Sequence, residues 1–429
     1  MRHHGWLPGF CLVAVVLFSF VPLYVFGNGF YIYEQGAKAV GMGGAFTAQA
    51  DDPSAIFYNP AGISQLKGTQ VMFGVSPIMP SASFESDSGR KWHAEDHTWI
   101  IPHFYATHKL TDKVSFGIGS YSNFGLGTEW PEDFEGRFTT GAGKAFIKTM
   151  TVSPIVSFEP IKGLSFGAGP AYRYLDISLR NRVAAGPSAR TNPAQTAMLR
   201  LTGDDWDWGY VLGVRYQITP SLSAGASYLS EMRHDLHSGK ARLNLAANGA
   251  SVTGYPQGAA AKITLPATAT FGFAYKLSAF TLEADAQWTE WSSYRKLAVE
   301  LDGGRTMESP KNWHNTWTLR FGGQYALNKY LDLRAGIVWD ETSIPRETLD
   351  PLVPSGNRWL YCAGLGINLG NLTFDVAYNY LDDQNRRWNN EAGNVNLSTP
   401  GGVVNLGKVT GTFKDTHAHI VSVSTRYQF

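Results

Sequence analysis

Apolar and polar residues alternate along most of the chain from about Thr69 onward, and this pattern limits the possible fold more than any other feature. The apolar members of the clearest segments are Leu331, Leu333, Ala335, Ile337 and Trp339; Leu372, Phe374, Val376, Tyr378 and Tyr380; and Phe280, Leu282, Ala284, Ala286 and Trp288. Charged residues such as Asp332, Arg334 and Asp375 occupy the opposite face. A period of two residues is typical of a β-strand with one face in an apolar medium. The sequence therefore predicts an all-β fold.

The connections between these segments alternate between long and short. Long polar stretches cover 86–96, 128–144, 181–202, 237–257, 293–309, 345–356 and 385–415. Tight turns lie between them at 111–113, 159–163, 219–220, 277–278, 328–329 and 370–371. Seven long loops and six turns separate about 14 strands and place both chain ends at the rim with the short turns, which is the plan of a bacterial outer-membrane barrel.

Tryptophan residues gather near the ends of the predicted strands. They are Trp206, Trp208, Trp288, Trp291, Trp313, Trp317 and Trp339. Aromatic girdles mark the two water interfaces of membrane barrels, so these residues favour a transmembrane antiparallel β-barrel. A soluble β-solenoid or sandwich shows the same alternation and is the alternative interpretation.

Charge and hydropathy exclude two classes of protein. The chain has 36 Lys+Arg against 35 Asp+Glu, so it lacks the basic excess with which a nucleic-acid-binding protein neutralises phosphates. Its mean hydropathy is −0.17. That value excludes a helical multi-span membrane protein, because each spanning helix needs about 20 mostly apolar residues.

The N-terminus carries the one long apolar run, residues 6–27, behind Arg2. A basic start, an apolar run and a small residue at Gly27 predict a secretory signal peptide over residues 1–27. A retained single-span anchor is the alternative. Removal of the run leaves Cys362 as the only cysteine, so the mature chain can form no internal disulfide.

Residues 28–68, here called the hatch segment, are rich in Gly and Ala and break the alternation. Asp52 before Pro53 and Asn59 before Pro60 are each a cap residue followed by proline at the first helical position. A segment this short cannot bury a core of its own. We therefore expect it to pack inside a barrel formed by residues 69–429. The alternative, a periplasmic tail, would expose its apolar side chains.

Several motifs of the hatch segment resemble one family. The run 34–46 reads EQGAKAVGMGGAF, and DDPSA at 51–55 and NPAG at 59–62 follow it. Further matches are SNFGLG at 122–127, WPED at 130–133, TLP at 264–266 and the terminal Phe429. Together they closely resemble the FadL-type outer-membrane transporters of long-chain fatty acids and hydrocarbons (OMPP1/FadL/TodX). The resemblance implies a 14-stranded barrel plugged by an N-terminal hatch.

The resemblance also implies the sites that act on the ligand. The implied capture loops are 181–202 and 237–257; the implied pocket and hatch residues are Asn28, Gly29, Phe30, Tyr31, Asn59, Pro60 and Ala61; and the implied lateral gate, a kink in the third strand, contains Gly117, Gly119, Asn123, Phe124 and Gly125. Glycine inside a strand weakens it and marks bends, which supports a kink. Ordinary barrel curvature also explains these glycines.

Cations in the predicted capture loops suggest an anionic ligand. They are Arg180, Arg182, Arg190, Arg200, Arg233, Lys240 and Arg242. No acidic residue lies between Ile177 and Gly203, and the arginines there alternate with Leu179, Leu199 and Leu201. Such a surface suits an amphiphilic anion, and equally the phosphates of lipid headgroups. In the lumen, Arg173 and Arg320 belong either to a structural charge network or to a site for a ligand carboxylate.

Competing functions find little support in the sequence. A barrel enzyme such as a lipase needs a recognisable nucleophile and base, and the histidines lie in no such motif. His417 and His419 are too few to hold a metal, so we predict no cofactor and no metal site. A general porin would be an open channel, which an apolar hatch opposes. Export of a lipid is left open.

We expect a non-enzymatic channel in the outer membrane of a Gram-negative bacterium that takes up long-chain fatty acids or hydrocarbons passively and releases them through the kink. Its expected partners are the hydrophobic ligand, outer-membrane lipids and the barrel assembly machinery, which Phe429 would engage. A monomer is expected.

Overall fold

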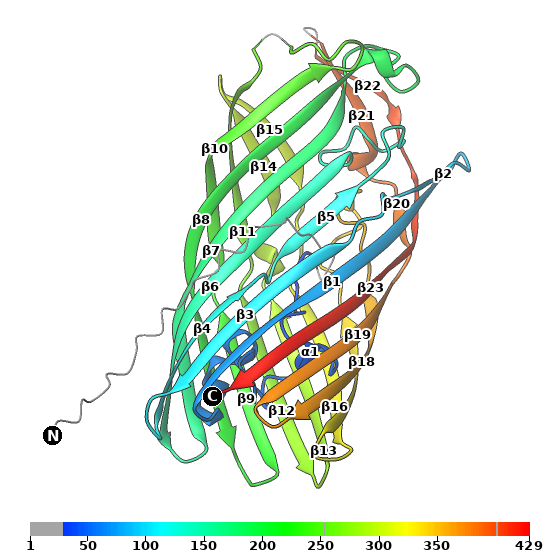
Figure 1. Ribbon diagram of the computed structural model, residues 1–429. Coiled ribbons are helices and arrows are strands. Elements are labelled where there is room, and N and C mark those ends of the chain that lie inside the picture. The colour runs from blue at the N-terminus through cyan, green and yellow to red at the C-terminus, as the bar shows by residue number, and fades with distance from the viewer. Residues whose placement is uncertain (1–28, 253, 400–401) are drawn as a thin grey trace, which may run out of the picture.

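The computed structural model describes residues 29–252, 254–399 and 402–429, and in these residues it forms a closed antiparallel β-barrel (Figure 1). The first and last strands pair with each other along nearly their whole length, from Gln70 opposite Gln428 to Ser86 opposite Gly411. Fourteen positions around the wall are occupied within the described part of the chain. The predicted signal peptide, 1–27, and Asn28 lie outside the described residues.

The helical elements are short and belong mostly to the hatch segment. They are α1 Ala37–Val40, α2 Ala55–Tyr58, η1 Pro60–Gln65, η2 Pro193–Gln195, η3 Trp291–Ser293 and η4 Glu391–Gly393. No helix in the described ranges is long and apolar enough to cross a membrane.

The strands of the first half begin at Thr69. They are β1 Thr69–Ser86, β2 Lys91–His93, β3 Trp99–Lys109, β4 Val114–Tyr121, β5 Gly125–Glu129, β6 Lys144–Ile161, β7 Leu164–Ala184, β8 Thr196–Gln217, β9 Leu222–Leu229, β10 Met232–Leu245, β11 Gln257–Leu265 and β12 Thr268–Leu277. Those of the second half are β13 Phe280–Thr289, β14 Lys296–Leu301, β15 Arg305–Pro310, β16 Thr316–Ala326, β17 Leu331–Asp340, β18 Arg358–Leu369, β19 Leu372–Asp383, β20 Arg386–Trp388, β21 Asn394–Thr399, β22 Gly402–Lys408 and β23 Gly411–Gln428.

Seven wall positions are built from two strands in succession. These are β2 with β3, β4 with β5, β9 with β10, β11 with β12, β13 with β14, β15 with β16, and β19 with β20. The prediction of about 14 strands is confirmed, because each broken position counts once. Strands β21 and β22 form a separate two-stranded sheet, and β21 contacts β7 of the wall.

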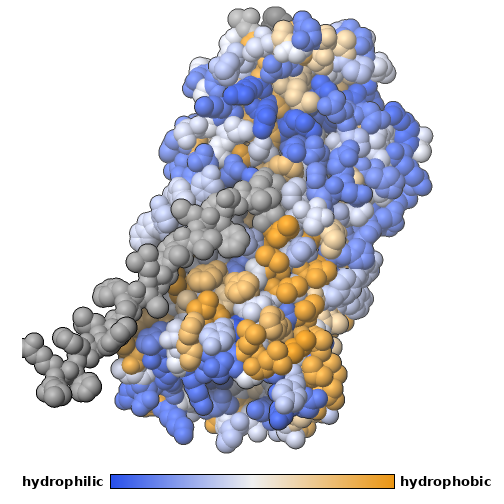
Figure 2. All heavy atoms as spheres, viewed as in Figure 1, coloured by the Kyte–Doolittle hydropathy of each residue, from blue (hydrophilic) through white to orange (hydrophobic). Residues whose placement is uncertain are grey.

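The outer surface carries an apolar belt below a polar upper part (Figure 2). Exposed members of the belt include Phe73, Phe104, Ile118, Phe158, Trp208, Phe273, Phe321, Tyr361 and Val376. Such a belt matches the hydrocarbon layer of a membrane. Of the predicted girdle, Trp206, Trp208 and Trp317 are exposed as expected, whereas Trp291 and Trp313 are buried, which corrects that part of the prediction.

Three of the predicted long loops contain long extensions of the strands. Strands β7 and β8 continue to Ala184 and from Thr196, and β10 and β11 extend to Leu245 and from Gln257. Strands β14 and β15 form a hairpin between Lys296 and Pro310. On β7 the inner face changes from Arg173 to Leu175, Ile177 and Leu179 going upward, while the outer face becomes polar. Above the membrane, water surrounds the wall, so the outward residues are polar and the inward residues are apolar. This is the reverse of the arrangement inside the membrane, and the polar outward residues made these segments resemble loops in the sequence.

The hatch segment lies within the ring of strands (Figure 1). Nearly every residue from Gly29 to Leu66 is buried, including Phe46, Ile56 and Ile63 at 0% exposure. Its helix α1 contacts β18, β19 and β23, whereas η1 contacts β6, β7 and β8. The segment therefore reaches the wall on several sides.

Candidate functional site

Two carboxylates of β13 hold the middle of the hatch segment. Glu283 accepts hydrogen bonds from the backbone N–H groups of Ala48 (2.6 Å) and Gln49 (3.0 Å). Asp285 accepts from those of Phe46 (3.0 Å) and Thr47 (3.1 Å). Four consecutive backbone amides thus depend on two side chains of the wall.

We expect Glu283→Ala combined with Asp285→Ala to loosen the hatch, because each buried amide left without a partner costs about 1–3 kcal/mol. In a liposome-swelling assay the double variant should admit small sugars that the parent protein excludes. Asp375→Ala is a control, since Asp375 bonds to Arg334 of the wall (2.7 Å). Equal sugar influx in the double variant and the parent would contradict the proposed anchor.

The predicted hatch residues Asn59, Pro60 and Ala61 lie against β7 and β8. The Asn59 side chain accepts from Ala61 N–H (3.2 Å) and donates to the carbonyls of Thr47 (2.8 Å) and Val214 (2.9 Å). A Cβ placed on Gly167 would lie 2.3 Å from the Pro60 carbonyl carbon. This close approach explains why the wall carries glycine opposite the hatch segment.

Phe30 is enclosed by aromatic side chains, which together form the aromatic chamber. Ring centroids of the enclosing residues lie 4.9 Å (Trp291), 5.8 Å (Tyr294), 5.9 Å (Trp313) and 6.1 Å (Phe124) from that of Phe30. Gly29 precedes it at φ 54°, and a Cβ there would lie 2.5 Å from Trp313 and 2.6 Å from Trp291. Only glycine combines this backbone conformation with this close approach.

The sequence pattern does not reveal the role of Trp291, Tyr294 and Trp313. The position of the two tryptophans near strand ends predicts that they belong to the membrane girdle. In the structure η3 and the residues before β16 turn inward, which buries Trp291 completely and leaves Trp313 at 4% exposure. The dense aromatic composition of 288–317 was the available signal, but it does not reveal on which side of the wall the rings lie.

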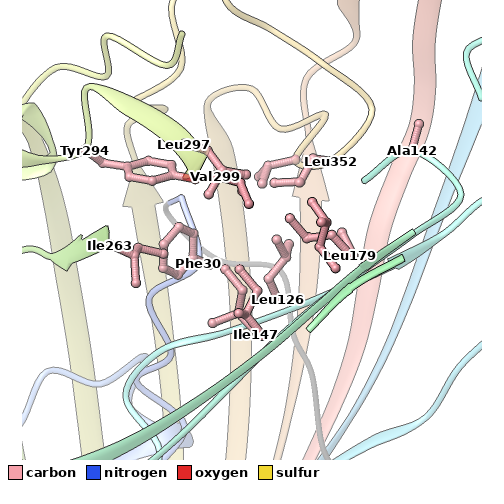
Figure 3. Packing of buried hydrophobic residues seen from close by; sticks show 14 of the residues in the cluster. Phe30, Leu126, Ala142, Ile147, Leu179, Ile263, Tyr294, Leu297, Val299 and Leu352 are labelled. Atoms are coloured by element: carbon pink, nitrogen blue, oxygen red, sulfur yellow. The ribbon is translucent and has the colours of Figure 1, made fainter. Parts of the chain in front are cut away.

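Above the aromatic chamber the interior is apolar (Figure 3). Leu126, Leu179 and Val299 point into the same space as Phe30. A groove of about 320 Å³, including the part open to solvent, continues between β7, β8, β10, β11 and β14. This upper groove is lined chiefly by Ile177, Leu179, Leu201, Leu236, Ala259, Ala261, Leu297 and Val299.

Arg173 is fully buried at the base of this apolar space. Its Nε donates to Thr151 Oγ1 and its Nη2 to Asn123 Oδ1, both at 3.0 Å. The guanidinium lies 5.0 Å from the Phe124 ring. Its Nη1 has no hydrogen-bond partner in the part of the chain that the structure describes, so one donor is available to a bound acceptor.

The wall is interrupted at residues 122–124, between β4 and β5. Strand β4 pairs with β3 only as far as Ser120 opposite Phe104, and the pairs recorded for β5 in the described residues are with β6. The edge of β3 above Phe104 therefore faces a wall gap. The hatch segment reaches into it: Ile32 N–H donates to the Asn123 carbonyl and Gly125 N–H to the Phe30 carbonyl, both at 2.9 Å.

The predicted gate residues divide into two groups. Asn123, Phe124 and Gly125 lie at the interruption, but Gly117 and Gly119 belong to the continuous part of β4. A Cβ on either glycine would lie within 2.8 Å of Ile56 in the hatch segment. These two glycines accommodate the hatch, so their assignment to a kink needs correction.

A second space, the lower cavity, lies beside the hatch segment. It measures about 490 Å³ including its part open to solvent, and Tyr31, Tyr33, Tyr121 and Arg320 contribute to its lining. Arg320 is 5% exposed, lies 5.2 Å from the Tyr33 ring and has no partner for its Nε among the described residues.

The predicted capture cations do not line the upper groove. Arg180 and Arg200 are on the outer faces of β7 and β8, whereas Leu179, Leu199 and Leu201 point inward. The alternation that we interpreted as one amphiphilic surface is therefore two opposite faces of a strand. Acidic residues from outside 177–203 also pair with three of the arginines: Arg180 with Glu129 (2.8 Å), Arg182 with Glu132 (3.0 Å) and Arg190 with Glu135 (3.2 Å).

The remaining capture cations lie on β10. Arg233 pairs with Glu231 at 2.7 Å, and Lys240 and Arg242 are exposed. None of the three contributes to the lining of the upper groove.

Solved structures of other proteins share this fold. A Pseudomonas aeruginosa FadL homologue superposes with a TM-score of 0.80 over 93% of this chain and 99% of its own, at 22% identity. The toluene transporter TodX of Pseudomonas putida does so with a TM-score of 0.69 over 93% and 99%, at 17% identity.

Sequence relatives cover nearly the whole chain. A putative outer membrane protein of Neisseria meningitidis serogroup B is 28% identical over 96% of this chain and 97% of its own length. The long-chain fatty acid transport protein of Escherichia coli K12 is 22% identical over 88% and 92%. The family profile described as outer membrane protein transport protein (OMPP1/FadL/TodX) matches residues 18–429. The chain thus belongs to the OMPP1/FadL/TodX family of Gram-negative outer-membrane β-barrel transport proteins, which is a transporter family and not an enzyme family.

Proposed function

We propose that this protein takes up hydrophobic molecules passively and releases them sideways into the membrane through the wall gap. The observation that carries the proposal is the absence of ladder pairing between β3 and β5 in the described residues. The hatch segment obstructs the axial route. Transfer of an apolar molecule into periplasmic water is unfavourable, whereas transfer into the membrane lipid that surrounds the apolar belt is favourable.

The apolar interior supports a route to this gap. A ligand caught in the upper groove would move down to the aromatic chamber and displace Phe30. The Phe30 carbonyl accepts a hydrogen bond from the Gly125 N–H group at the gap. Displacement of Phe30 would break this bond and withdraw the hatch backbone from the gap. Occupation of the chamber and opening of the gap would then be coupled.

The names of similar proteins include both fatty acid and toluene transporters, and these ligands differ in a carboxylate. Arg173 is our proposed partner for that group, because its buried Nη1 has no described acceptor. A carboxylate would form a charge-assisted hydrogen bond there. Uptake of oleate and toluene into cells that lack their own transporter would test the function directly; failure to increase either would refute it.

We expect Arg173→Met to weaken oleate binding by about 10- to 150-fold, since hydrogen bonds to charged groups contribute about 1.5–3 kcal/mol. Toluene binding should change little, because toluene has no acceptor. Titration of the purified protein with both ligands provides the measurement. Arg320→Met is the matched control, and a larger loss of oleate affinity in that variant would move the carboxylate site to the lower cavity.

A further inference from the structure

Four cations form a horizontal line on the outer face of neighbouring strands; we call them the basic row. Lys144 of β6 lies opposite Arg180 of β7, Arg180 opposite Arg200 of β8, and Arg200 opposite Arg242 of β10. These strands run side by side in the upper part of the barrel (Figure 1). Adjacent members are therefore separated by one strand spacing, about 4.8 Å at the backbone.

The basic row is only partly neutralised. Glu129 of β5 contacts Lys144 and Arg180, each at 2.8 Å. Arg200 and Arg242 are exposed and make no ion pair within the described ranges. Like charges directly opposite each other destabilise a sheet, so this arrangement costs stability unless an anion from outside lies against it.

Some other cations on the polar upper surface are matched by acids, although exposed Lys240 and Arg305 have no ion pair among the described residues. Lys296 pairs with Glu308 across β14 and β15 at 2.6 Å, Lys414 pairs with Glu85 at 3.0 Å, and Arg387 pairs with Asp87. The basic row differs from these pairs, because it sets four cations side by side against one carboxylate.

The row lies a short distance above the apolar belt. On β7 the outward residues go from Tyr172 and Tyr174 to Asp176, Ser178 and Arg180. Arg180 is six residue steps beyond Tyr174, which is about 20 Å along the strand and about 15 Å in height at the usual strand tilt of about 40°. That is the zone of sugars and phosphates outside the hydrocarbon layer.

We infer that the basic row binds the phosphate groups of a phosphorylated glycolipid of the outer leaflet. Guanidinium groups match phosphate oxygens in a bidentate geometry. The apolar belt directly below accommodates the acyl chains of the same molecule, an anchor that a soluble anion does not have. The transported ligand is a poorer occupant, because the upper groove opens from the opposite face of β7 and β8.

The test compares two triple variants of the full chain in detergent. One carries Arg180→Gln, Arg200→Gln and Arg242→Gln; the control carries Lys296→Gln, Arg387→Gln and Lys414→Gln and loses the same charge. Both are titrated with rough-type lipopolysaccharide and with its dephosphorylated form. The basic-row variant should bind the phosphorylated form about tenfold or more weakly, in a salt-sensitive manner, and the control within about twofold of the parent.

Thermal unfolding without glycolipid separates binding from a structural role. Removal of the like charges should leave the Tm of the basic-row variant unchanged or raised, whereas a structural row would lower it. A double variant, Arg200→Gln with Arg242→Gln, keeps the pair of Arg180 and Glu129 and should show most of the affinity loss if the triple variant does not fold. Equal affinities of the basic-row and control variants, or a loss that is the same for the dephosphorylated form, would overturn the inference.

Discussion

Deletion of Ser122 should reduce uptake of a hydrophobic ligand by about tenfold or more while leaving the binding affinity nearly unchanged. In β4, Tyr121 lies opposite Thr151, and in β5, Gly125 lies opposite Lys148. The chain from Tyr121 to Gly125 thus takes four residue steps, whereas β6 takes three steps between their partners. The β4–β5 side therefore contains one extra residue. Removing it lets β4 and β5 continue in one register with β6 and gives β3 a neighbour to pair with.

The variant Ser122→Ala controls for this deletion, since it changes the side chain and keeps the extra residue. Uptake by Ser122→Ala should stay close to that of the parent protein. Ligand titration and the heat-modifiable mobility of the barrel establish that the deletion variant binds and folds. If that variant folds, binds and still transports at the parental rate, the ligand leaves by another route, and the wall gap is not its exit.

The second large effect concerns the aromatic chamber. Trp291→Ala with Trp313→Ala should weaken binding of toluene and of oleate alike. A ligand that buries about 100 Å² against the two rings would lose about 2.5 kcal/mol at about 25 cal/mol per Å², or roughly 70-fold in Kd. Fluorescence or calorimetric titration of the purified variant measures the change.

Trp206→Ala with Trp208→Ala is the matched pair for this experiment. These tryptophans are 46% and 68% exposed in the outer belt, so their loss should leave the Kd nearly unchanged. Similar losses in both double variants would show that the effect comes from general destabilisation of the barrel, and the chamber would lose its role as the binding site.

The sequence by itself determined the barrel and the approximate number of its strands. Alternation such as that of 331–339 places every second side chain on one face, and only a closed sheet satisfies all the backbone groups of such strands in lipid. The alternation of long and short connections fixed the direction of the strands. The cap residue Asn59 followed by Pro60 predicted the start of η1, which the structure confirms.

Sequence reasoning was weaker where residues distant in the chain meet. Of the five predicted gate residues, Asn123, Phe124 and Gly125 lie at the interruption of the wall. Gly117 and Gly119 instead lie against Ile56 of the hatch segment. Sequence reasoning found Arg173 but not Asn123 as its partner, because nothing in the local pattern connects the two positions.

The tertiary structure alone decided which side of the wall each residue occupies above the membrane and which charges remain unpaired. Alternation with a period of two is the same whether the apolar face looks outward to lipid or inward to an apolar core. Arg180 and Arg200 therefore proved to lie on the exterior. Trp291 and Trp313 lie outside the strands, and only the inward packing of η3 and of the residues before β16 places them in the interior. Glu129 and Glu132, which pair with Arg180 and Arg182, come from another strand and its loop. Which charges pair across strands depends on the register in which those strands lie side by side. The local sequence around each residue does not specify that register.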